Sequence, residues 1–484
     1  MYTSLNKNLT QLRLMFADSA DLTIRELRLR SDKNALAALI TIEGMCDKEV
    51  LAASVMNPLL AFDFGSKTGD ELEASVRGSV LSSAEMIEVI EFDEAVNYAV
   101  SGFAVLAFDG CKKMLAVGVQ GYAFRGVEEP ESEVVQRGSR EGFCEPLRIN
   151  MSLIRRRIKS PDLVFELMSV GEKSKTQLML CYLKSRASEK LIQTVRTRVE
   201  NCDLEAVLGA GYLSEYLEDD GGKSIFSGVG ISERPDTVCG KLIEGRIAVI
   251  VDGTPAVMIV PRLFVEEFQA VDDYSNRPYY ATFIRALKYM AIIISVYLPG
   301  IYTAFAQYHP EYFPTWILIK TSESISHTPL PVTLEVLLIA FVYEIMKEAG
   351  LRIPKSLGHA VSIVGALVIG ESAVNAGIIS ASTLMVVAVA AICSYVTSPL
   401  YPPVMTLRFL FIIVGGMIGL WGIVLASCVV VINMCSKTSL GIPYLSSLSP
   451  FARRTMRDVV LRAPWKTLSK HTIRVQNFPE TEDE

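Results

Sequence analysis

The chain has 484 residues, too many for one compact core, so two or three domains are expected. The hydrophobic fraction is 50% and the mean hydropathy is +0.33, yet the charged fraction of 21% is ordinary, which indicates a soluble half joined to a membrane half. The net charge of −6 excludes the clustered positive surface of a nucleic-acid-binding protein, so no nucleic-acid partner is expected.

The beginning of the chain and its cysteines indicate a reduced, cytosolic environment. Residues 1–14 contain no apolar stretch of the signal-peptide type, so the first half of the chain is expected to stay in the cytosol. The nine cysteines are scattered singly, with no CxxC pair and no Cys/His cluster of ligand spacing. They are expected to be reduced and mostly buried, and no metal site is predicted.

The soluble half contains an imperfect repeat that begins with a strand and a helix. Residues 39–44 form an apolar, β-branched run, and Asp47 then caps an amphipathic helix that is expected to end before Pro58. Residues 180–185 repeat this layout, with Ser188 in the place of Asp47. The same unit is therefore predicted twice.

Each copy continues, after a helical stretch, into a hairpin. Asp109-Gly110 separates two apolar runs in the first copy, and Asp252-Gly253 does so in the second; this dipeptide favours the type I′ turn. The predicted fold class is an α/β cytosolic region of two related subdomains followed by an α-helical transmembrane bundle. The predicted domains are the two subdomains at residues 1–149 and 150–280, the transmembrane region at 281–436 and a basic cytosolic tail at 437–484.

Motifs of enzymes and nucleotide-binding proteins are absent or incomplete. Residues 221–224 resemble part of a P-loop, but Leu217 stands in the place of the first glycine and residues 218–220 are acidic, so a solvated acidic turn is the better interpretation. The four histidines lie far apart, and no HExxH or GxSxG motif occurs. The chain is therefore not expected to be an enzyme, and no cofactor is predicted.

The membrane half is predicted to begin with a spanning helix at residues 286–308, which is long enough to cross a hydrocarbon core of roughly 30 Å. Arg285 and Lys288 at its start place the soluble half on the positive, cytosolic side. Pro299-Gly300 is expected to kink the helix. Further apolar segments follow at residues 332–345, 359–374, 378–395 and 407–432.

The number of membrane crossings stays open at this point. The basic loop 347–355 and the basic tail beyond Lys437 should both face the cytosol. Five full crossings from a cytosolic start would leave the tail outside. Either one segment does not cross, or residues 407–432, which are interrupted by Gly419, fold back.

Four polar side chains lie on otherwise apolar segments, at Glu335, Glu344, Glu371 and Asn375. An ionisable group inside a membrane is costly and usually faces a bundle interior, a pore or a partner, so these residues are functional candidates. Glu371 and Asn375 share one face if their segment is helical. The alternative is a helix break at Glu371 among lipid headgroups. Glu344 is expected at the interface because Lys347 follows within a turn.

Small residues recur at every fourth position just before Glu371, at Gly358, Ser362, Ala366 and Gly370. One interpretation is close helix packing through Gly358, Ala366 and Gly370. The other is a narrow pore that several copies line and gate, which requires an oligomer. The pore or gate candidates are Val361, Ser362, Gly365, Ile369, Glu371 and Asn375.

Several longer motifs run through almost the whole chain. In the soluble half they are REGF, IRRRIK, ERPD and the stretch EGR to DGTP, at residues 140–143, 154–159, 233–236 and 244–255. In the membrane half they are HPE, KEAGLRIPK, a small-residue run and GIPYL, at residues 309–311, 347–355, 361–370 and 441–445. With these motifs the chain resembles the A subunits of the GerA-type spore germinant receptors and their close paralogue, the stage V sporulation protein AF.

The resemblance implies a subunit of a three-part receptor in the inner membrane of bacterial spores, beside a multi-span B subunit and a lipoprotein C subunit. In this family the B subunit is thought to hold the nutrient. The A subunit is thought to oligomerise, with a pentamer as one form, into a nutrient-gated cation channel. Membrane lipid is a further expected partner. The alternatives are a scaffold or amplifier subunit and a secondary transporter with its site at Glu371.

The chain departs from the family pattern at two places. Glutamine is common in the family where Glu371 and Asn375 stand, which implies a titratable group at the pore mouth and a different ion preference. Residues 320–330 do not match the Arg-Glu-Gly-Val-Pro-like loop of the family, so the resemblance predicts no contacts for that loop.

Overall fold

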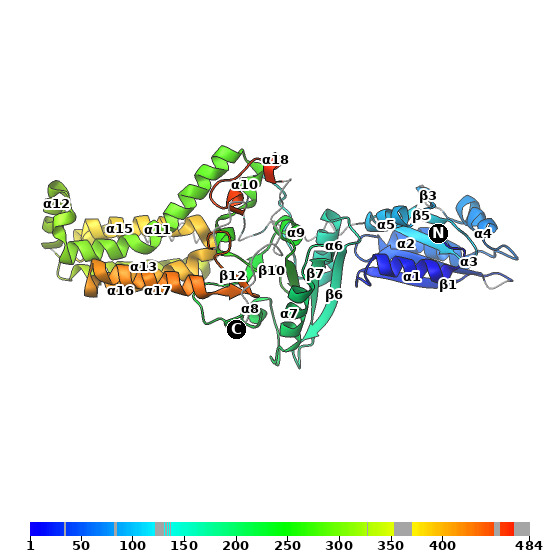
Figure 1. Cartoon of the computed structure of the whole chain (residues 1–484), viewed down its shortest axis with the longest axis horizontal. Coiled ribbons are helices and arrows are strands. Elements are labelled where there is room, and N and C mark those ends of the chain that lie inside the picture. Colours follow the sequence, from blue (N-terminus) through cyan, green and yellow to red (C-terminus); the bar gives the residue numbers. More distant parts are fainter. Residues whose placement is uncertain are drawn as a thin grey trace.

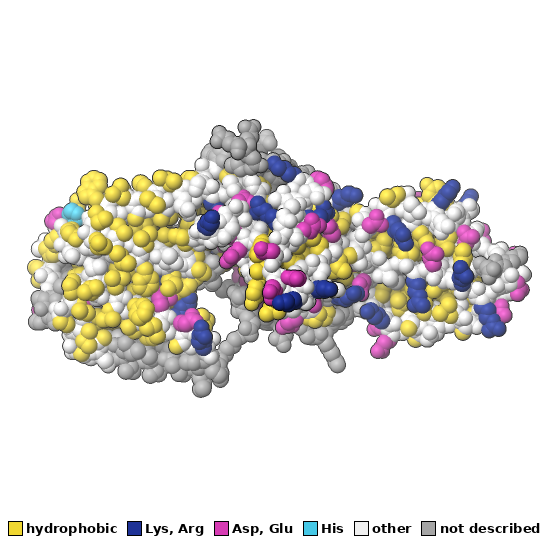
Figure 2. Space-filling model, turned by 90° about the horizontal axis from the view of Figure 1, so that it is seen from below, with side chains coloured by type: hydrophobic (Ala, Val, Ile, Leu, Met, Phe, Trp, Pro, Cys, Tyr) yellow, Lys and Arg dark blue, Asp and Glu magenta, His cyan; other side chains and the backbone are white. Residues whose placement is uncertain are grey.

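The computed structural model describes residues 1–32, 35–81, 85–121, 130, 133, 135, 137–326, 328–352, 370–449 and 455–468. The molecule is elongated, with two α/β units following one another along its long axis and a group of helices at the opposite end (Figure 1). Figure 2 shows hydrophobic side chains over most of the helical end, whereas charged side chains gather over the α/β units. This division is the one that the composition predicts.

The first unit is an antiparallel sheet between two helical layers. Its five strands have the order β1-β2-β4-β5-β3. The strands are β1 (Leu22–Arg28), β2 (Leu36–Ile42), β3 (Met86–Val89), β4 (Phe103–Phe108) and β5 (Met114–Gly118). One face packs on α1 (Leu5–Met15) and α5 (Phe92–Val100).

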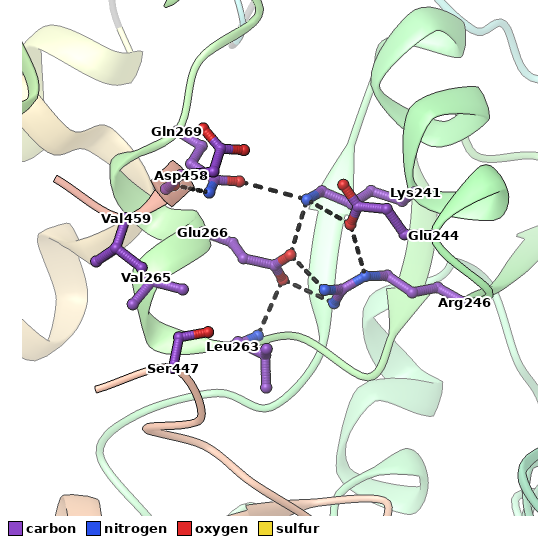
Figure 3. A pocket seen from close by; sticks show the side chains of 10 residues that line it. All are labelled: Lys241, Glu244, Arg246, Leu263, Val265, Glu266, Gln269, Ser447, Asp458 and Val459. Atoms are coloured by element: carbon purple, nitrogen blue, oxygen red, sulfur yellow. Dashed lines mark hydrogen bonds and ion pairs between the residues drawn. The ribbon is translucent and has the colours of Figure 1, made fainter. Parts of the chain in front are cut away.

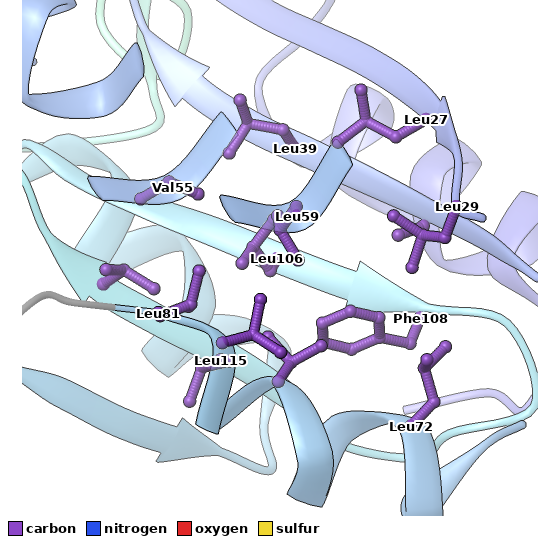
Figure 4. Packing of buried hydrophobic residues seen from close by; sticks show 14 of the residues in the cluster. Leu27, Leu29, Leu39, Val55, Leu59, Leu72, Leu81, Leu106, Phe108 and Leu115 are labelled. Atoms are coloured by element: carbon purple, nitrogen blue, oxygen red, sulfur yellow. The ribbon is translucent and has the colours of Figure 1, made fainter. Parts of the chain in front are cut away.

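The opposite face of the first sheet carries a second apolar core, which Figure 4 shows. The helical segments over it are α2 (Lys48–Leu51), a π-helix (Ala52–Met56), α3 (Asn57–Ala61), α4 (Asp70–Ser75) and a second π-helix (Val76–Val80). Leu39 and Leu106 of the sheet are buried there against Val55 and Leu59. Burial of such side chains is the main favourable term for this unit.

The second unit repeats the first. Its five strands have the order β6-β7-β9-β10-β8, which corresponds strand by strand to the first sheet. The strands are β6 (Leu163–Val170), β7 (Thr176–Leu183), β8 (Gly230–Ser232), β9 (Ile247–Val251) and β10 (Val257–Val260). The helices are α6 (Leu147–Arg157) and α9 (Pro235–Ile243) on one face, and α7 (Glu189–Glu200) and α8 (Gly211–Leu217) on the other.

The Asp-Gly dipeptides have a different role from the predicted type I′ turn. Residues 109–113 join the two strands of the first hairpin, and residues 252–256 join those of the second. Neither hairpin therefore has a two-residue turn. Asp109 instead accepts a hydrogen bond from the N–H of Leu5 at 3.0 Å, and Asp252 accepts one from the N–H of Leu147 at 3.0 Å. In each repeat the aspartate thus satisfies a free N–H at the start of the helix that precedes its sheet.

The caps predicted for the helices that follow β2 and β7 are confirmed only in part. The carboxylate of Asp47 accepts the N–H groups of Glu49 and Val50 at 2.8 and 3.0 Å, as predicted. Ser188 precedes α7 but makes no side-chain cap. The first helical segment does not end before Pro58, because this residue lies in the first turn of α3, where its missing N–H is not needed.

The second half of the chain is helical. Its main helices are α11 (Pro278–Tyr308), α12 (Thr315–Ser326), α13 (Val332–Arg352), α15 (Ala381–Ser394), α16 (Tyr401–Ile418) and α17 (Leu420–Ser436). Among the described residues, α11 and α16 are long and apolar enough to cross a membrane, and α15 and α17 are apolar but shorter. The predicted helical region is therefore confirmed, whereas a complete transmembrane bundle is shown only in part. Pro299 lies inside α11, which Figure 1 shows to be bent.

Short elements connect the two halves and continue after the last long helix. Before the helices lie a 3-10 helix (Phe264–Phe268) and α10 (Val271–Ser275). Between the long helices are the 3-10 helices Pro310–Tyr312, after α11, and Tyr395–Leu400, after α15. The chain then forms β11 (Thr438–Ser439), β12 (Ile442–Pro443), a 3-10 helix (Thr455–Asp458) and α18 (Trp465–Leu468).

Residues 407–432 fold back, which was one of the two alternatives that the sequence left open. Gly419 has φ +72° and separates α16 from α17. Val404 near the start of α16 and Met434 near the end of α17 belong to one apolar cluster with Phe226 of the second α/β unit. The two helices therefore run in opposite directions, and the tail emerges on the side of the α/β units. Residues 347–352 continue α13, so the predicted basic loop is wrong up to Arg352.

Candidate functional site

The start of α11 is joined to the tail by a buried ion cluster. The guanidinium of Arg285 lies 2.7 Å from Asp273 and 2.7 Å from Asp458 of the tail, and the Arg285 side chain is 0% exposed. Lys288 donates to the carbonyl of Phe268 at 3.1 Å. The charge of Arg285 is thus neutralised inside the protein. The cytosolic orientation that Arg285 and Lys288 indicate in the sequence stays a prediction.

A second cluster surrounds Glu266 of the linker between the α/β units and α11 (Figure 3). Its carboxylate accepts from Lys241 of α9 at 2.7 Å and from Arg246 beside β9 at 2.8 Å. Asp458 and Gln269 line the same cavity, which has a volume of about 20 Å³, room for one water but not for a nutrient. Burial would raise the pKa of Glu266, but the charges of Arg246, Lys241 and Arg262 outweigh it and lower the pKa.

The lowered pKa of Glu266 predicts a specific acid dependence. A carboxyl group whose pKa is lowered by folding contributes stability that is present above its ordinary pKa of 4.5 and is lost as the pH falls below it. The difference in unfolding temperature between the native chain and Glu266→Gln should therefore shrink as the pH falls from about 5 to about 3. Each tenfold change in the proton affinity of the carboxylate corresponds to about 1.4 kcal/mol of unfolding free energy. Calorimetry of the full chain in detergent measures this difference.

A matched control for that measurement is Glu205→Gln, which changes an exposed carboxylate of the second α/β unit, 71% exposed and paired with Lys173. Its difference from the native chain should stay nearly constant over the same pH range. A constant difference for Glu266→Gln as well would show that Glu266 has no lowered pKa.

The acidic turn at residues 218–220 joins the second α/β unit to the chain that follows α17. Lys437, just after α17, lies 3.5 Å from Glu218 and 3.0 Å from Asp220 and is 2% exposed. Asp219 accepts from the hydroxyl of Thr438 and from the N–H of Gly441. The turn is therefore not simply solvated, because it holds the chain that follows the last long helix.

The GIPYL motif completes this contact with an aromatic cluster. Tyr444 is buried against Phe226 and Phe264, with ring centroids at 6.1 and 5.9 Å. Phe268 stacks on Tyr289 of α11 at 3.8 Å. Aromatic pairs of this kind add to the area that they bury. The tail, the second α/β unit and α11 are thereby packed into one junction.

A buried arginine lies among the helices. Arg408 of α16 is fully buried and donates to the carbonyl and hydroxyl oxygens of Ser295 in α11 at 3.1 and 2.7 Å. Glu344 of α13 lies 3.6 Å from Arg408 and accepts from Tyr401 at 2.5 Å. The Glu344 side chain is thus mostly enclosed by α16. Its partner Tyr401 is the first residue of α16, and the predicted place of Glu344 at the membrane interface stays a prediction.

Glu335 of α13 is also fully buried, and its side chain contacts the start of α15. Its carboxylate accepts from the N–H of Ser380 and the hydroxyl of Thr383, both at 3.1 Å, and from the hydroxyl of Thr328. The N-terminus of a helix stabilises a negative charge, so these contacts explain how the carboxylate is tolerated in an apolar region. This candidate therefore has a role in joining α13 to α15.

Most of the predicted pore segment lies outside the described residues. This applies to Gly358, Val361, Ser362, Gly365, Ala366 and Ile369. Residues 370–375 are helical, so Glu371 and Asn375 share a face as predicted, and both are exposed. Gly370 is buried, and a Cβ atom there would lie 3.3 Å from the side chain of Leu384.

Close helix approach also occurs at positions that the sequence did not single out for packing. A Cβ atom on Gly300 of α11 would lie 2.6 Å from the carbonyl oxygen of Phe411 in α16. A Cβ atom on Gly415 would lie 2.5 Å from the carbonyl oxygen of Gly300. Since real Cβ atoms essentially never come so close, only glycine fits here.

These features define a membrane-associated protein in which a duplicated α/β region is fixed to apolar helices through buried ion pairs. The chain belongs to the Bacillus/Clostridium GerA spore germination protein family, whose model matches residues 10–473. The resemblance found in the sequence is thereby confirmed. Members of this family are membrane-associated germinant receptor subunits that act in spore germination.

Three comparisons describe the relationship in more detail. Over 464 residues the chain is 36% identical to Spore germination protein KA of Bacillus subtilis (strain 168), covering 96% of this chain and 85% of that protein. Over 460 residues it is 28% identical to Stage V sporulation protein AF of the same organism, covering 94% and 92%. The N-terminal domain of the A subunit of the Bacillus megaterium spore germinant receptor GerK3, a crystal structure, matches 55% of this chain and 97% of that chain with 27% identity and a TM-score of 0.41.

Proposed function

We propose that this chain, a subunit without catalytic activity, oligomerises into a nutrient-gated cation channel that releases ions to start germination. It acts beside the B and C subunits of a germinant receptor in the inner spore membrane, with the α/β units and the tail in the cytosol. A pentamer is the oligomer that the resemblance implies. Binding of nutrient in a partner would open the channel by shifting the packing of its helices.

The observation that carries this proposal is the exposure of Glu371 and Asn375 on one helical face. In the single chain both side chains are exposed in a region whose other helices are apolar. An ionised carboxylate that faces lipid is costly, by about 2.5–3.5 kcal/mol or more at the bilayer centre and by less toward the headgroups. The cost disappears when this face turns toward water or toward polar groups of neighbouring copies, as it does around an aqueous path.

The junction supports the gating part of the proposal. A movement of the α/β units would reach α11 through Arg285 and would reach α17 through Lys437. Arg408 ties α16 to α11, so a movement of α11 would also reach α16. Buried ion pairs of this kind have few alternative arrangements, which favours movement of the helices as a unit.

The experiment that tests the proposal is potassium efflux from spores, with and without nutrient, for Glu371→Gln and Asn375→Ala. A channel lined by this face should show efflux changed by roughly tenfold, as expected when about 1.4 kcal/mol of interaction with the ion is lost. Glu348→Gln is the matched control, because Glu348 is 59% exposed on α13 and pairs only with Arg352 of its own helix among the described residues.

Protein level and association with the B subunit are measured in the same spores. Normal efflux in both variants, at normal protein level, would contradict the channel and favour the scaffold or amplifier subunit. Efflux that depends on a proton gradient only when Glu371 is present would instead favour a secondary transporter.

A further inference from the structure

A groove with a volume of about 510 Å³ opens beside the first turn of α11. One wall is formed by that turn, including Tyr279 and Thr282, and the other by the tail, including Arg457, Leu461 and Arg462. The backbone N–H of Arg462 donates to the hydroxyl of Thr282 at 3.0 Å, which fixes the tail against the helix. The groove is therefore built by two segments that lie far apart in the sequence.

The groove lies where α11 would enter a membrane. Its surroundings carry exposed aromatic side chains, with Tyr279 71% exposed, Phe283 65% exposed and Trp465 58% exposed. Aromatic residues of this kind gather at the level of lipid headgroups. Leu461, which is also exposed, adds an apolar surface inside the groove. A lipid molecule could therefore reach the groove from the bilayer surface.

Two arginines give the groove a positive charge, and no ion pair to a carboxylate is formed by either of them among the described residues. Arg462 donates from Nη2 to the carbonyl oxygen of Tyr274 at 3.3 Å, and its guanidinium lies over the ring of Trp465. Arg462 is 3% exposed, and its Nε atom has no hydrogen-bond partner among the described residues. Arg457 is exposed and forms no ion pair within the part of the chain that the structure describes. The neighbouring carboxylate of Asp458 is already occupied by Arg285 and by the hydroxyl of Tyr274.

The first turn of α11 adds to this positive charge. It contains no acidic residue, and Arg277 at its N-cap makes no side-chain cap. The free N–H groups and the dipole of a long helix favour an anion at this end. Together with the unpartnered Nε of Arg462, the helix end gives an anion two independent sources of attraction.

We propose that this groove binds the headgroup phosphate of an anionic phospholipid. Arg457 and Arg462 attract the phosphate, and Tyr279 and Leu461 cover the apolar part of the same molecule. These apolar side chains favour a lipid over free phosphate, since a free ion gains nothing from them. The bound lipid would hold the tail and the start of α11 at the membrane surface, beside the Asp273–Arg285–Asp458 cluster.

Native mass spectrometry of the detergent-solubilised full chain tests this site, with phosphatidylglycerol and phosphatidylcholine titrated separately. Phosphatidylglycerol should bind at least roughly fivefold more tightly, because the choline cation of phosphatidylcholine offsets its phosphate. Arg457→Gln should weaken the binding of phosphatidylglycerol by roughly fivefold and that of phosphatidylcholine by less, as expected for about 1 kcal/mol per arginine acting on a net negative charge. Arg457→Lys should retain most of the affinity. Arg28→Gln, the same change at an exposed position of β1 far from the groove, should have no effect.

Inorganic phosphate is added as a competitor to separate the two sources of the same chemistry. A large excess of phosphate should leave phosphatidylglycerol bound. Equal affinity for the two lipids, an equal loss in Arg28→Gln, or displacement by phosphate would overturn the proposal. The last result would assign the groove to a free anion.

Discussion

Replacing Arg285 with methionine is expected to release the tail from α11 and to destabilise the junction by about 3–5 kcal/mol. The change leaves Asp273 and Asp458 buried without their shared cation, while a methionine of similar length fills much of the space. The costly part of this variant is the two buried carboxylates, since only Lys288, 4.0 Å from Asp273, remains as a cation beside them. The lost attraction itself contributes less, because in the native protein the cost of desolvating the charged groups offsets much of it.

Amide hydrogen exchange of the full chain in detergent measures this effect where it arises. Residues 455–468 should exchange at least about 100-fold faster in Arg285→Met, because local opening of the tail becomes that much more favourable. Arg277→Met is the matched control. Arg277 is exposed just before α11, so its substitution should change protection by less than about 0.5 kcal/mol.

A triple variant separates the two parts of the energy. Adding Asp273→Asn and Asp458→Asn to Arg285→Met removes both stranded charges, and protection of the tail should largely return. If Arg285→Met alone leaves exchange of residues 455–468 unchanged, the Asp273–Arg285–Asp458 cluster does not hold the tail.

The sequence predicted the central strands of both sheets but not their edges. β2, β4, β7 and β9 are buried on both faces and therefore read as continuous apolar runs. The edge strands are exposed on one side and contain charged residues, such as Arg25 in β1 and Glu166 in β6. Such strands lack the apolar run that identifies the central ones.

The buried ion pairs were harder to predict than the strands. Asp458 lies in a segment whose many arginines indicate a basic tail, and nothing near it in the sequence shows that it pairs with Arg285. Arg408 did offer a signal, since it is a lone charge in a long apolar run. Its partners in α11 and α13 come from the packing of the helices, which local sequence patterns do not contain.

The arginine run at residues 155–157 is another place where the local sequence does not reveal which partner each side chain has. Arg155 is fully buried and lies 2.7 Å from Asp21, which is also fully buried and belongs to the first α/β unit. Arg156 and Arg157 instead pair with Glu141 near the surface, which links the IRRRIK motif to the REGF motif. The sequence marks the run as a family motif but does not distinguish the three side chains.

Arg155→Met is expected to destabilise the contact between the two α/β units by about 3–5 kcal/mol, since it leaves Asp21 buried and unpaired. Arg155 also donates to the carbonyl oxygens of Ser160 and Leu163 at 2.7 and 2.8 Å, so two acceptors lose their donor as well. For a unit of this size the unfolding temperature should fall by about 10 °C or more. Differential scanning calorimetry of the full chain in detergent measures the change.

Arg156→Met removes the same charge from the next position, where the side chain is 20% exposed and its partner Glu141 is 36% exposed. A pair so close to water contributes about 1 kcal/mol or less, so this control should unfold within a few degrees of the native chain. Adding Asp21→Leu to Arg155→Met should restore much of the lost stability, because the stranded carboxylate is then gone. Equal effects of Arg155→Met and Arg156→Met would mean that the Asp21–Arg155 pair does not hold the repeats together, and that the apolar surfaces between them do so instead.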